Sequence, residues 1–434
     1  MLRILQRVFG RDAHAQSEQA FRIAIERART IQRLGYDIGF SFLPRFYDTP
    51  FLYVCDGRLG PQKLTGVGFD CFSRSDAFIK TLSETLERAI WNGDMLYWKE
   101  GSVRGTSNSL NAPALELANL SGFSDAQRHM SKGLTFDATT EFLWSRGVRL
   151  KDGTPLYVPA QLVSGKYTAD MSGKEPLLRI PNSNGLATHE SFDEAARRGL
   201  LELIERDAFM ITFHNMISPP RIDPASITDK RAGSIIAQIQ KYGFKLDILS
   251  LPTDMPVTVI CCLLRDESGA GPSLAVGARA GEDPTEAIIG ALTEALGVYY
   301  LARTLKLYKE PTPERVLSAI ERIALWAKPE NTPTLSWLWE GTMGTMPKSR
   351  KRMSAKKLAA SAEQKGCSIA AIAMIPPKLQ KLGLHSVCVV SPELQPLNLD
   401  SEPPYLGGVR LRSVPESLGY TAKDAPPPYP HPFP

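Results

Sequence analysis

Residues 199–208 read GLLELIERDA and lie within an apolar segment that predicts one long helix over Phe192–Phe213. Glu202 and Glu205 are three positions apart, so a helix presents both carboxylates on one face. Their apolar neighbours indicate a partly buried position, where two carboxylates are costly without a cation. A hard divalent ion would remove that cost.

The motif Glu-x-x-Glu-Arg occurs twice, at residues 84–88 and 202–206, and its first copy lies in the predicted helix Asp76–Trp91. The predicted helix Pro284–Leu305 adds a third carboxylate position among apolar neighbours. Mg²⁺ usually combines a few carboxylates with phosphate oxygens, and arginine binds phosphate through paired hydrogen bonds. Arg88 and Arg206 are therefore candidates for nucleotide contacts. The predicted metal ligands are Glu84, Glu87, Glu202, Glu205 and Glu294.

Plainer interpretations exist for each motif. Glu-x-x-Glu-Arg is common on solvated helix faces, where ion pairs are weak. Glu194 fits a capping box with Ser191, and Asn184 fits a turn before the helix. Gly66-Val67-Gly68 alone is a weak dinucleotide signal, and the chain has no P-loop motif. A nucleotide site here would have to differ from both of those phosphate-binding loops.

The composition indicates a soluble globular protein. The 434 residues are 43% hydrophobic and 22% charged, with a net charge of +5, which excludes a disordered chain and a coiled coil. No apolar run approaches the roughly 20 residues of a membrane-spanning helix, and polar residues interrupt the basic N-terminus too early for an export signal. Six cysteines without a C-x-x-C pair favour reduced thiols in the cytoplasm. The basic run Lys348–Lys357 carries no interleaved aromatics, so we expect a solvated segment and no nucleic-acid partner.

Alternating strand and helix patterns predict a mixed α/β or α+β fold. The strand candidates are Phe51–Cys55, Glu141–Val148, Leu156–Leu162, Phe244–Leu249, Val257–Leu264 and Val387–Val390. Besides the three helices above, the helix candidates are Ala15–Leu34, Ser226–Tyr242 and Glu314–Ala327. Residues 426–434 read PPPYPHPFP, which by composition alone is typical of a disordered end.

Taken together, three stretches resemble the YcaO family. They are residues 183–208, Gly66–Gly68 followed by 77–88, and 283–295. The resemblance spans about Tyr53 to the C-terminus. It implies a YcaO-type fold that binds ATP and Mg²⁺ between long helices without a P-loop, and it implies three units: an N-terminal helical segment (1–52), a catalytic domain (53–420) and a proline-rich tail (421–434).

Carried over by position, the resemblance implies roles for individual residues. The five glutamates become the magnesium and phosphate shell, and Glu202 also contacts the nucleotide. The other implied nucleotide contacts are Asn184, Glu194, Arg88 and Arg206. Leu394–Leu397 and the last five residues look like the ends of azoline-forming cyclodehydratases, whose tails enter the active site. The terminal carboxylate of Pro434 is then the implied base.

The implied reaction converts Cys, Ser or Thr of a ribosomal precursor peptide into a thiazoline or oxazoline. ATP phosphorylates the backbone amide oxygen during this cyclodehydration. Because only about 52 residues precede the resemblance, we expect a separate leader-binding protein of the winged-helix or adenylylating-enzyme type. The same resemblance suggests a flavin-dependent azoline dehydrogenase as a further partner in the complex. Two alternatives remain: a YcaO enzyme that forms a thioamide or amidine, and a non-catalytic scaffold.

Overall fold

A computed structural model of the chain describes residues 2–60, 66–93, 100–170, 174–180, 182–305, 311–313, 316, 318–398 and 404–433. Within these ranges, apolar strands form three sheets in which nearly all neighbours are antiparallel. The first has the order β1 (Ile38–Phe42), β2 (Tyr53–Leu59) and β3 (Gly66–Asp70). The second has the order β11 (Leu274–Gly281), β10 (Thr258–Arg265), β9 (Lys245–Leu251), β8 (Arg221–Ile222) and β12 (Met343–Gly344). The third has the order β4 (Val103–Gly105), β5 (Phe142–Arg149), β13 (Ala370–Ala373), β14 (His385–Val390) and β7 (Leu186–His189), with β6 (Pro155–Pro159) on β5.

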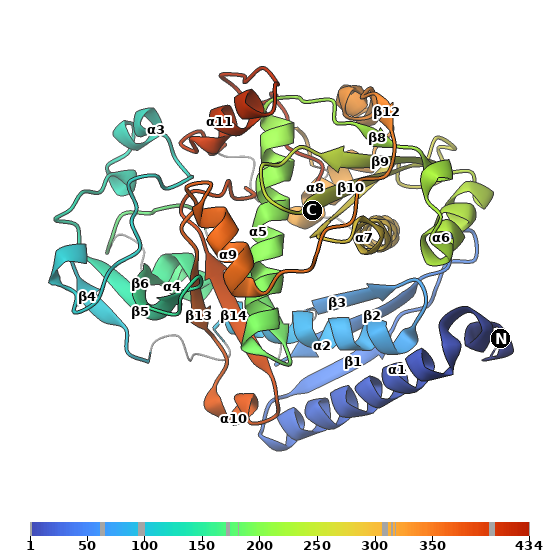
Figure 1. Ribbon diagram of the computed structural model, residues 1–434, viewed down its shortest axis with the longest axis horizontal. Helices are drawn as coiled ribbons and strands as arrows, with labels where there is room; N and C mark the ends of the chain where they lie inside the picture. The colour runs from blue at the N-terminus through green and yellow to red at the C-terminus, as the bar shows by residue number, and fades with distance from the viewer. Residues whose placement is uncertain are drawn as a thin grey trace.

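Helices cover the three sheets, as Figure 1 shows. The longer ones are α1 (Leu2–Arg33), α2 (Arg74–Trp91), α5 (Phe192–His214), α6 (Lys230–Lys241) and α7 (Pro284–Thr304). The shorter ones are α3 (Asp125–His129), α4 (Gly165–Asp170), α8 (Ala319–Trp326), α9 (Ala355–Glu363), α10 (Pro377–Gln380) and α11 (Arg410–Ser417). None of the helices described here is long and apolar enough to span a bilayer.

The central helix α5 lies between two sheets. Its buried residues pack with Val276 and Ala278 of β11 on one side and with Val387 and Val389 of β14 on the other. Helix α7 covers the opposite face of β10 and β11, and α2 covers β2 and β3. The three helices that carry the candidate glutamates therefore meet where the three sheets approach one another.

Close packing between these helices and the strands depends on glycines in the strands and in α5. A Cβ on Gly277 of β11 would lie 2.3 Å from the Ala295 nitrogen and 2.4 Å from the Ala291 oxygen of α7. Likewise, a Cβ on Gly199 of α5 would lie 2.3 Å from the oxygen of Gly185, just before β7. Gly66 and Gly68 of β3 pack in the same way against the backbone of α2. The Gly-x-Gly sequence at 66–68 is thus a helix–strand contact.

The mixed fold is confirmed, and the largely antiparallel sheets match the α+β form. Most predicted elements shift by a few residues at their ends, which is the usual uncertainty for helix and strand boundaries. Three interpretations need correction. The helix predicted over Ala15–Leu34 is α1, which begins much earlier, at Leu2. Residues 160–162 form a 3₁₀ turn instead of extending the strand β6, and the helix predicted over Glu314–Ala327 is α8, which begins at Ala319. Residues 314, 315 and 317 lie outside the described residues.

The contact between β11 and α7 makes a testable prediction. Gly277→Ala should lower the free energy of unfolding by about 1–3 kcal/mol, because the added methyl meets helix backbone that cannot rotate away. Gly233→Ala is the matched control: this glycine lies in α6, and nothing lies within 4 Å of its added Cβ. Urea denaturation should show Gly233→Ala unchanged or stabilised. Equal stability of the two variants would contradict the close approach.

Candidate functional site

The free edges of two strands hold four of the five candidate glutamates. Strands β7 and β11 are terminal strands of their sheets, so they present backbone N–H groups without a strand partner. The Thr188 N–H of β7 donates to Glu87 at 2.6 Å, and the neighbouring Gly185 N–H donates to Glu202 at 2.9 Å. These two contacts place the carboxylates of α2 and α5 along one sheet edge.

The backbone N–H groups at the edge of β11 also donate to glutamates. The Ala280 N–H donates to Glu205 Oε2 at 2.8 Å, and the Ala278 N–H donates to Glu294 Oε2 at 2.8 Å. Helix α5 thus directs Glu202 to one edge and Glu205, one turn further, to the other. Backbone hydrogen bonds orient four of the five predicted glutamates.

Arg206 links the carboxylates of α5. Its guanidinium donates to Glu205 at 2.8 Å and to Glu202 at 3.4 Å, while its Nε has no hydrogen-bond partner among the described residues. Glu202, Glu205 and Glu294 together raise the pKa of Arg206, although burial opposes its charge. Arg88 likewise donates to Glu84 at 2.8 Å. Both arginines predicted to contact phosphate are therefore held by glutamates.

The pKa values of three of the carboxylates are raised. Burial raises the pKa of Glu87 well above its ordinary value, and the charges of Glu84 and Glu202 add to the rise. Burial also raises the pKa of Glu202, with Arg206 opposing it. The pKa of Glu294 rises to about 7 because of burial and the nearby Glu205. The nearby arginines do not offset all of this negative charge, and a divalent cation would supply more positive charge.

These residues fit a metal ion that is shared with a phosphate group. The donors are all carboxylate oxygens, which suit Mg²⁺. Among the described residues, no group of three acidic, His or Cys side chains is arranged as a complete metal site. An ion would therefore take one or two carboxylates and complete its shell with water and phosphate.

The structure separates Glu194 from this cluster. Glu194 lies eight residues before Glu202 on α5 and pairs with Arg197, Arg198 and Arg352. The backbone N–H of Glu194 donates to the Ser191 hydroxyl at 3.2 Å, so the predicted cap forms from the serine side only. The basic run thus reaches the start of α5, where Arg352 neutralises Glu194.

Asn184 lies between the cluster and a small cavity. Its backbone N–H donates to Asn182 Oδ1 at 3.2 Å, as expected for a turn. Its side-chain nitrogen is buried and has no partner in the described part of the chain. Asn184 lines the cavity together with Arg179, Asn182 and Gln395. An unpaired amide of this kind is available to a ligand.

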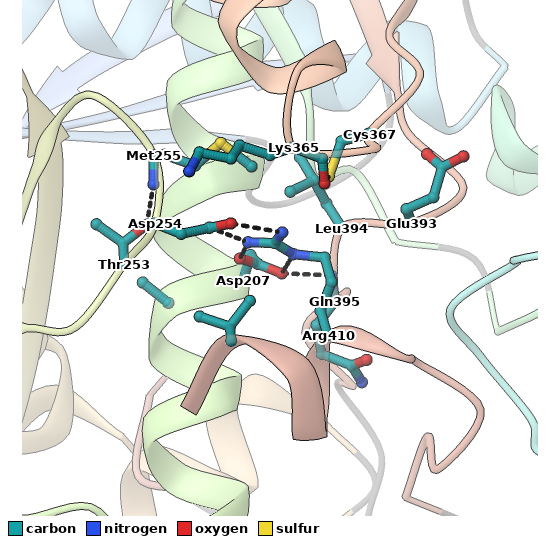
Figure 2. A network of polar contacts seen from close by, with 12 residues as sticks. Asp207, Thr253, Asp254, Met255, Lys365, Cys367, Glu393, Leu394, Gln395 and Arg410 are labelled. Carbon is teal, nitrogen blue, oxygen red and sulfur yellow. Dashed lines mark hydrogen bonds and ion pairs between the residues drawn. The ribbon is translucent and has the colours of Figure 1, made fainter. Parts of the chain in front are cut away.

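Asp207 anchors the segment that follows Arg206. Figure 2 shows its buried carboxylate paired with Arg410, which also pairs with Asp254. The distances to Arg410 are 2.7 Å from Asp207 and 2.6 Å from Asp254. The Gln395 N–H adds a hydrogen bond to Asp207 at 2.8 Å. The sequence carries no signal for this network, because its partners lie far apart in the chain. The network joins α5, α11 and the loop after β14.

The described part of the proline-rich tail, up to Phe433, packs along α5 toward Arg206. The Lys423 N–H donates to Asn215 Oδ1 at 2.7 Å near the end of α5. His431 and Phe433 are 1% and 0% exposed, and the Phe433 ring lies 4.2 Å from the guanidinium carbon of Arg206. The composition of the tail is typical of a disordered end, but the aromatic side chains of the tail pack on α5 and fix its position. Pro434, whose carboxylate was the implied base, lies outside the described residues.

A family model described as YcaO cyclodehydratase, ATP- and Mg²⁺-binding, matches residues 71–395. The chain therefore belongs to the YcaO family, and it carries the domain to which that description assigns ATP and Mg²⁺ binding. Its fold is also that of solved YcaO structures. An uncharacterized protein in the tfuA 3′ region of Rhizobium leguminosarum bv. trifolii is 32% identical over 161 residues. That match covers 35% of this chain and 37% of the relative, so the chain matches well under half of this curated relative.

Three solved structures share the fold. A heterocyclase in complex with substrate and cofactor has a TM-score of 0.70 at 20% identity, over 94% of this chain and 57% of that one. YcaO from Methanopyrus kandleri, bound with AMPPCP and Mg²⁺, has a TM-score of 0.63 at 17% identity, covering 87% and 91%. The E. coli microcin synthetase McbBCD complex with pro-MccB17 bound has a TM-score of 0.64 at 12% identity, covering 91% and 96%. At these identities the likeness concerns the fold alone.

Docking of the tail makes stability depend on pH. Burial lowers the pKa of His431 well below 6.5, and the nearby Arg322 adds to the effect. The unfolded chain takes up a proton at His431 below about pH 6.5 and the folded chain does not, so stability present above that pH is lost as the pH falls. Between pH 7.5 and 5.5 this loss should be about 1.4 kcal/mol.

The control for this prediction is His431→Gln, which keeps a donor for the Asn398 carbonyl, 2.8 Å from His431 Nε2. Urea denaturation at the two pH values should show a smaller loss in the variant. Burial also lowers the pKa of His189 and His214, but their contributions cancel in the comparison. An equal loss in both proteins would show that His431 is not held uncharged in the fold.

Proposed function

We propose that the chain is an ATP-dependent cyclodehydratase that forms thiazoline or oxazoline rings in a ribosomal precursor peptide. The observation that carries the proposal is the line of four carboxylates along two sheet edges, with Glu84 beside them and a tail docked on Arg206 between them. Family membership supports ATP and Mg²⁺ as reactants. The heterocyclase and microcin synthetase folds support ring formation.

In the proposed reaction, the side-chain sulfur or oxygen of Cys, Ser or Thr bonds to the preceding carbonyl carbon. The carbonyl oxygen becomes an oxyanion and attacks the γ-phosphorus of ATP, so that ADP leaves. The amide nitrogen then loses its proton, and phosphate leaves with the former carbonyl oxygen as the C=N bond forms. The products are the azoline, ADP and phosphate.

Residues of this chain position and neutralise the reacting groups. Glu84, Glu87, Glu202, Glu205 and Glu294 are the proposed ligands of Mg²⁺ ions, which when bound offset the charge of the phosphates. The unpaired Asn184 amide and Arg206 Nε are candidate donors to the nucleotide. Arg88 lies at the exposed end of the cluster and is the second candidate arginine. Glu194 is the least favoured of the predicted contacts, because three arginines already neutralise it.

The tail is the proposed source of the base. Phe433 packs against Arg206 and Phe209, with a ring separation of 4.9 Å from Phe209. One residue further, the carboxylate of Pro434 would be available to accept the proton of the nucleophile. Stiff proline segments reduce the ordering cost of such docking.

The proposed partners are the precursor peptide, a separate leader-binding protein and a flavin-dependent dehydrogenase that would oxidise azolines. The McbBCD neighbour is a complex, which supports a multi-subunit arrangement. We place the protein in the cytoplasm because all six cysteines are buried and unpaired, as expected in a reducing compartment.

The direct test is mass spectrometry of a co-expressed peptide encoded beside the gene. Ring formation should remove one water mass per modified Cys, Ser or Thr and require ATP. Exchange of oxygen for sulfur would identify a thioamide-forming enzyme, and water loss without consumption of a side-chain nucleophile would identify an amidine. An unmodified peptide and no ATP turnover, with the leader-binding protein present, would favour a scaffold.

Glu205→Gln should reduce ATP turnover by about 10² or more, because it removes one charge from the metal shell while keeping an acceptor for Ala280. Glu286→Gln is the matched control, since Glu286 is an exposed residue of α7 paired with Arg231. Circular dichroism should show both variants folded. Wild-type turnover in Glu205→Gln would refute the site.

Deletion of residues 431–434 should abolish ring formation by removing the base and the Phe433 contact. A tag added after Pro434 keeps the docked residues but moves the carboxylate, and a misplacement near 1 Å can cost about 10²-fold in rate. AMPPCP affinity should stay within about threefold in the tagged protein, because the glutamates are unchanged. Normal ring formation by the tagged protein would exclude the carboxylate as base.

A further inference from the structure

Arg279 of β11 lies between the two residues that anchor Glu205 and Glu294. The N–H groups of Ala278 and Ala280 point along the strand edge to these carboxylates. Side chains alternate along a strand, so Arg279 projects to the opposite face from Ala278 and Ala280. That face is covered by α7, which carries Glu294.

A glycine on α7 leaves room for this arginine. A Cβ on Gly290 would lie 2.9 Å from Arg279 Cγ and 2.9 Å from Arg279 Nε. The stem of Arg279 therefore lies against the helix at Gly290, one turn before Glu294. Its positive charge is close enough to Glu294 to lower the pKa of that carboxyl, against the rise caused by burial.

The guanidinium of Arg279 remains available. The side chain is exposed, and no hydrogen bond or ion pair joins it to any residue in the described ranges. The contrast with the other two arginines of the site is direct, because Arg88 and Arg206 donate to glutamates. Arg279 lies beside carboxylates that are candidate ligands of a metal ion. A guanidinium without a carboxylate partner can bind a phosphate group there through paired hydrogen bonds.

We propose that Arg279 binds a phosphoryl group of the nucleotide, on the side of the cluster formed by Glu205 and Glu294. The proposal rests on the proposed function, since it assumes that ATP is the ligand. Arg279 would complete a site in which the metal ion and the arginine hold the polyphosphate from two sides. Its position on a strand fixes the stem, and Gly290 directs it along α7.

The test is a calorimetric titration of the full chain with Mg²⁺ and AMPPCP, and separately with adenosine. Arg279→Gln should weaken AMPPCP binding about tenfold or more, as expected for loss of a charge-assisted hydrogen bond, and leave adenosine binding unchanged. Arg279→Lys should fall between, because lysine keeps the charge and loses the paired geometry. Arg146→Gln is the matched control, an exposed arginine of β5 in another sheet.

Gly290→Ala provides a second variant in which Arg279 is retained. Alanine favours the helix, so the melting temperature should not fall, while the added methyl displaces the arginine stem and weakens AMPPCP binding. Wild-type affinity in both Arg279→Gln and Gly290→Ala would overturn the assignment of Arg279 and leave the proposed function intact. Equal weakening of AMPPCP and adenosine would also overturn it, because the effect would then not concern phosphate. Failure of the wild-type chain to bind AMPPCP would instead refute the proposed function.

Discussion

The site depends on unpaired backbone N–H groups at the free edges of β7 and β11. Backbone N–H groups at a strand edge cost free energy when they have no hydrogen-bond partner and are shielded from water. Such an edge can also pair with a strand of another chain. Here glutamates from three helices accept these N–H groups: Glu87 and Glu202 at or beside β7, and Glu205 and Glu294 at β11. The same contacts that satisfy the edges fix one oxygen of each carboxylate.

This arrangement concentrates negative charge in a poorly solvated place. Arg206 offsets part of it, yet the pKa values of Glu87, Glu202 and Glu294 remain raised, mainly by burial. The folded chain therefore carries an unfavourable repulsion between buried carboxylates, which a bound cation would reduce. Such strained electrostatics are typical of sites that bind metal ions and nucleotides. The close helix–strand contacts at Gly277 and Gly199 hold the carboxylates in place against their repulsion.

The sequence predicted the helices well and the strands that complete the site poorly. Apolar periodicity and caps located α2, α5 and α7 within a few residues, and the repeated Glu-x-x-Glu-Arg motif pointed to four of the five candidate glutamates. Strand β11 was missed because LAVGARAG is rich in alanine and glycine, which have low strand propensity. Strand β7 was missed because only four residues form it. Without these strands, neither the anchoring N–H groups nor Arg279 could be placed, since long-range pairing sets them. The docked tail was foreseen only through the family resemblance, because its composition is that of a disordered end.

The central claim is that the carboxylates along the two edges bind a divalent ion together with nucleotide. Crystals grown with Mn²⁺ and AMPPCP would test it through anomalous diffraction at the manganese edge. We expect an anomalous peak about 2.1–2.2 Å from oxygens of one or two of Glu87, Glu202, Glu205 and Glu294, with the remaining ligands from phosphate and water. A nucleotide bound elsewhere, or a manganese peak with none of these carboxylates in its shell, would contradict it.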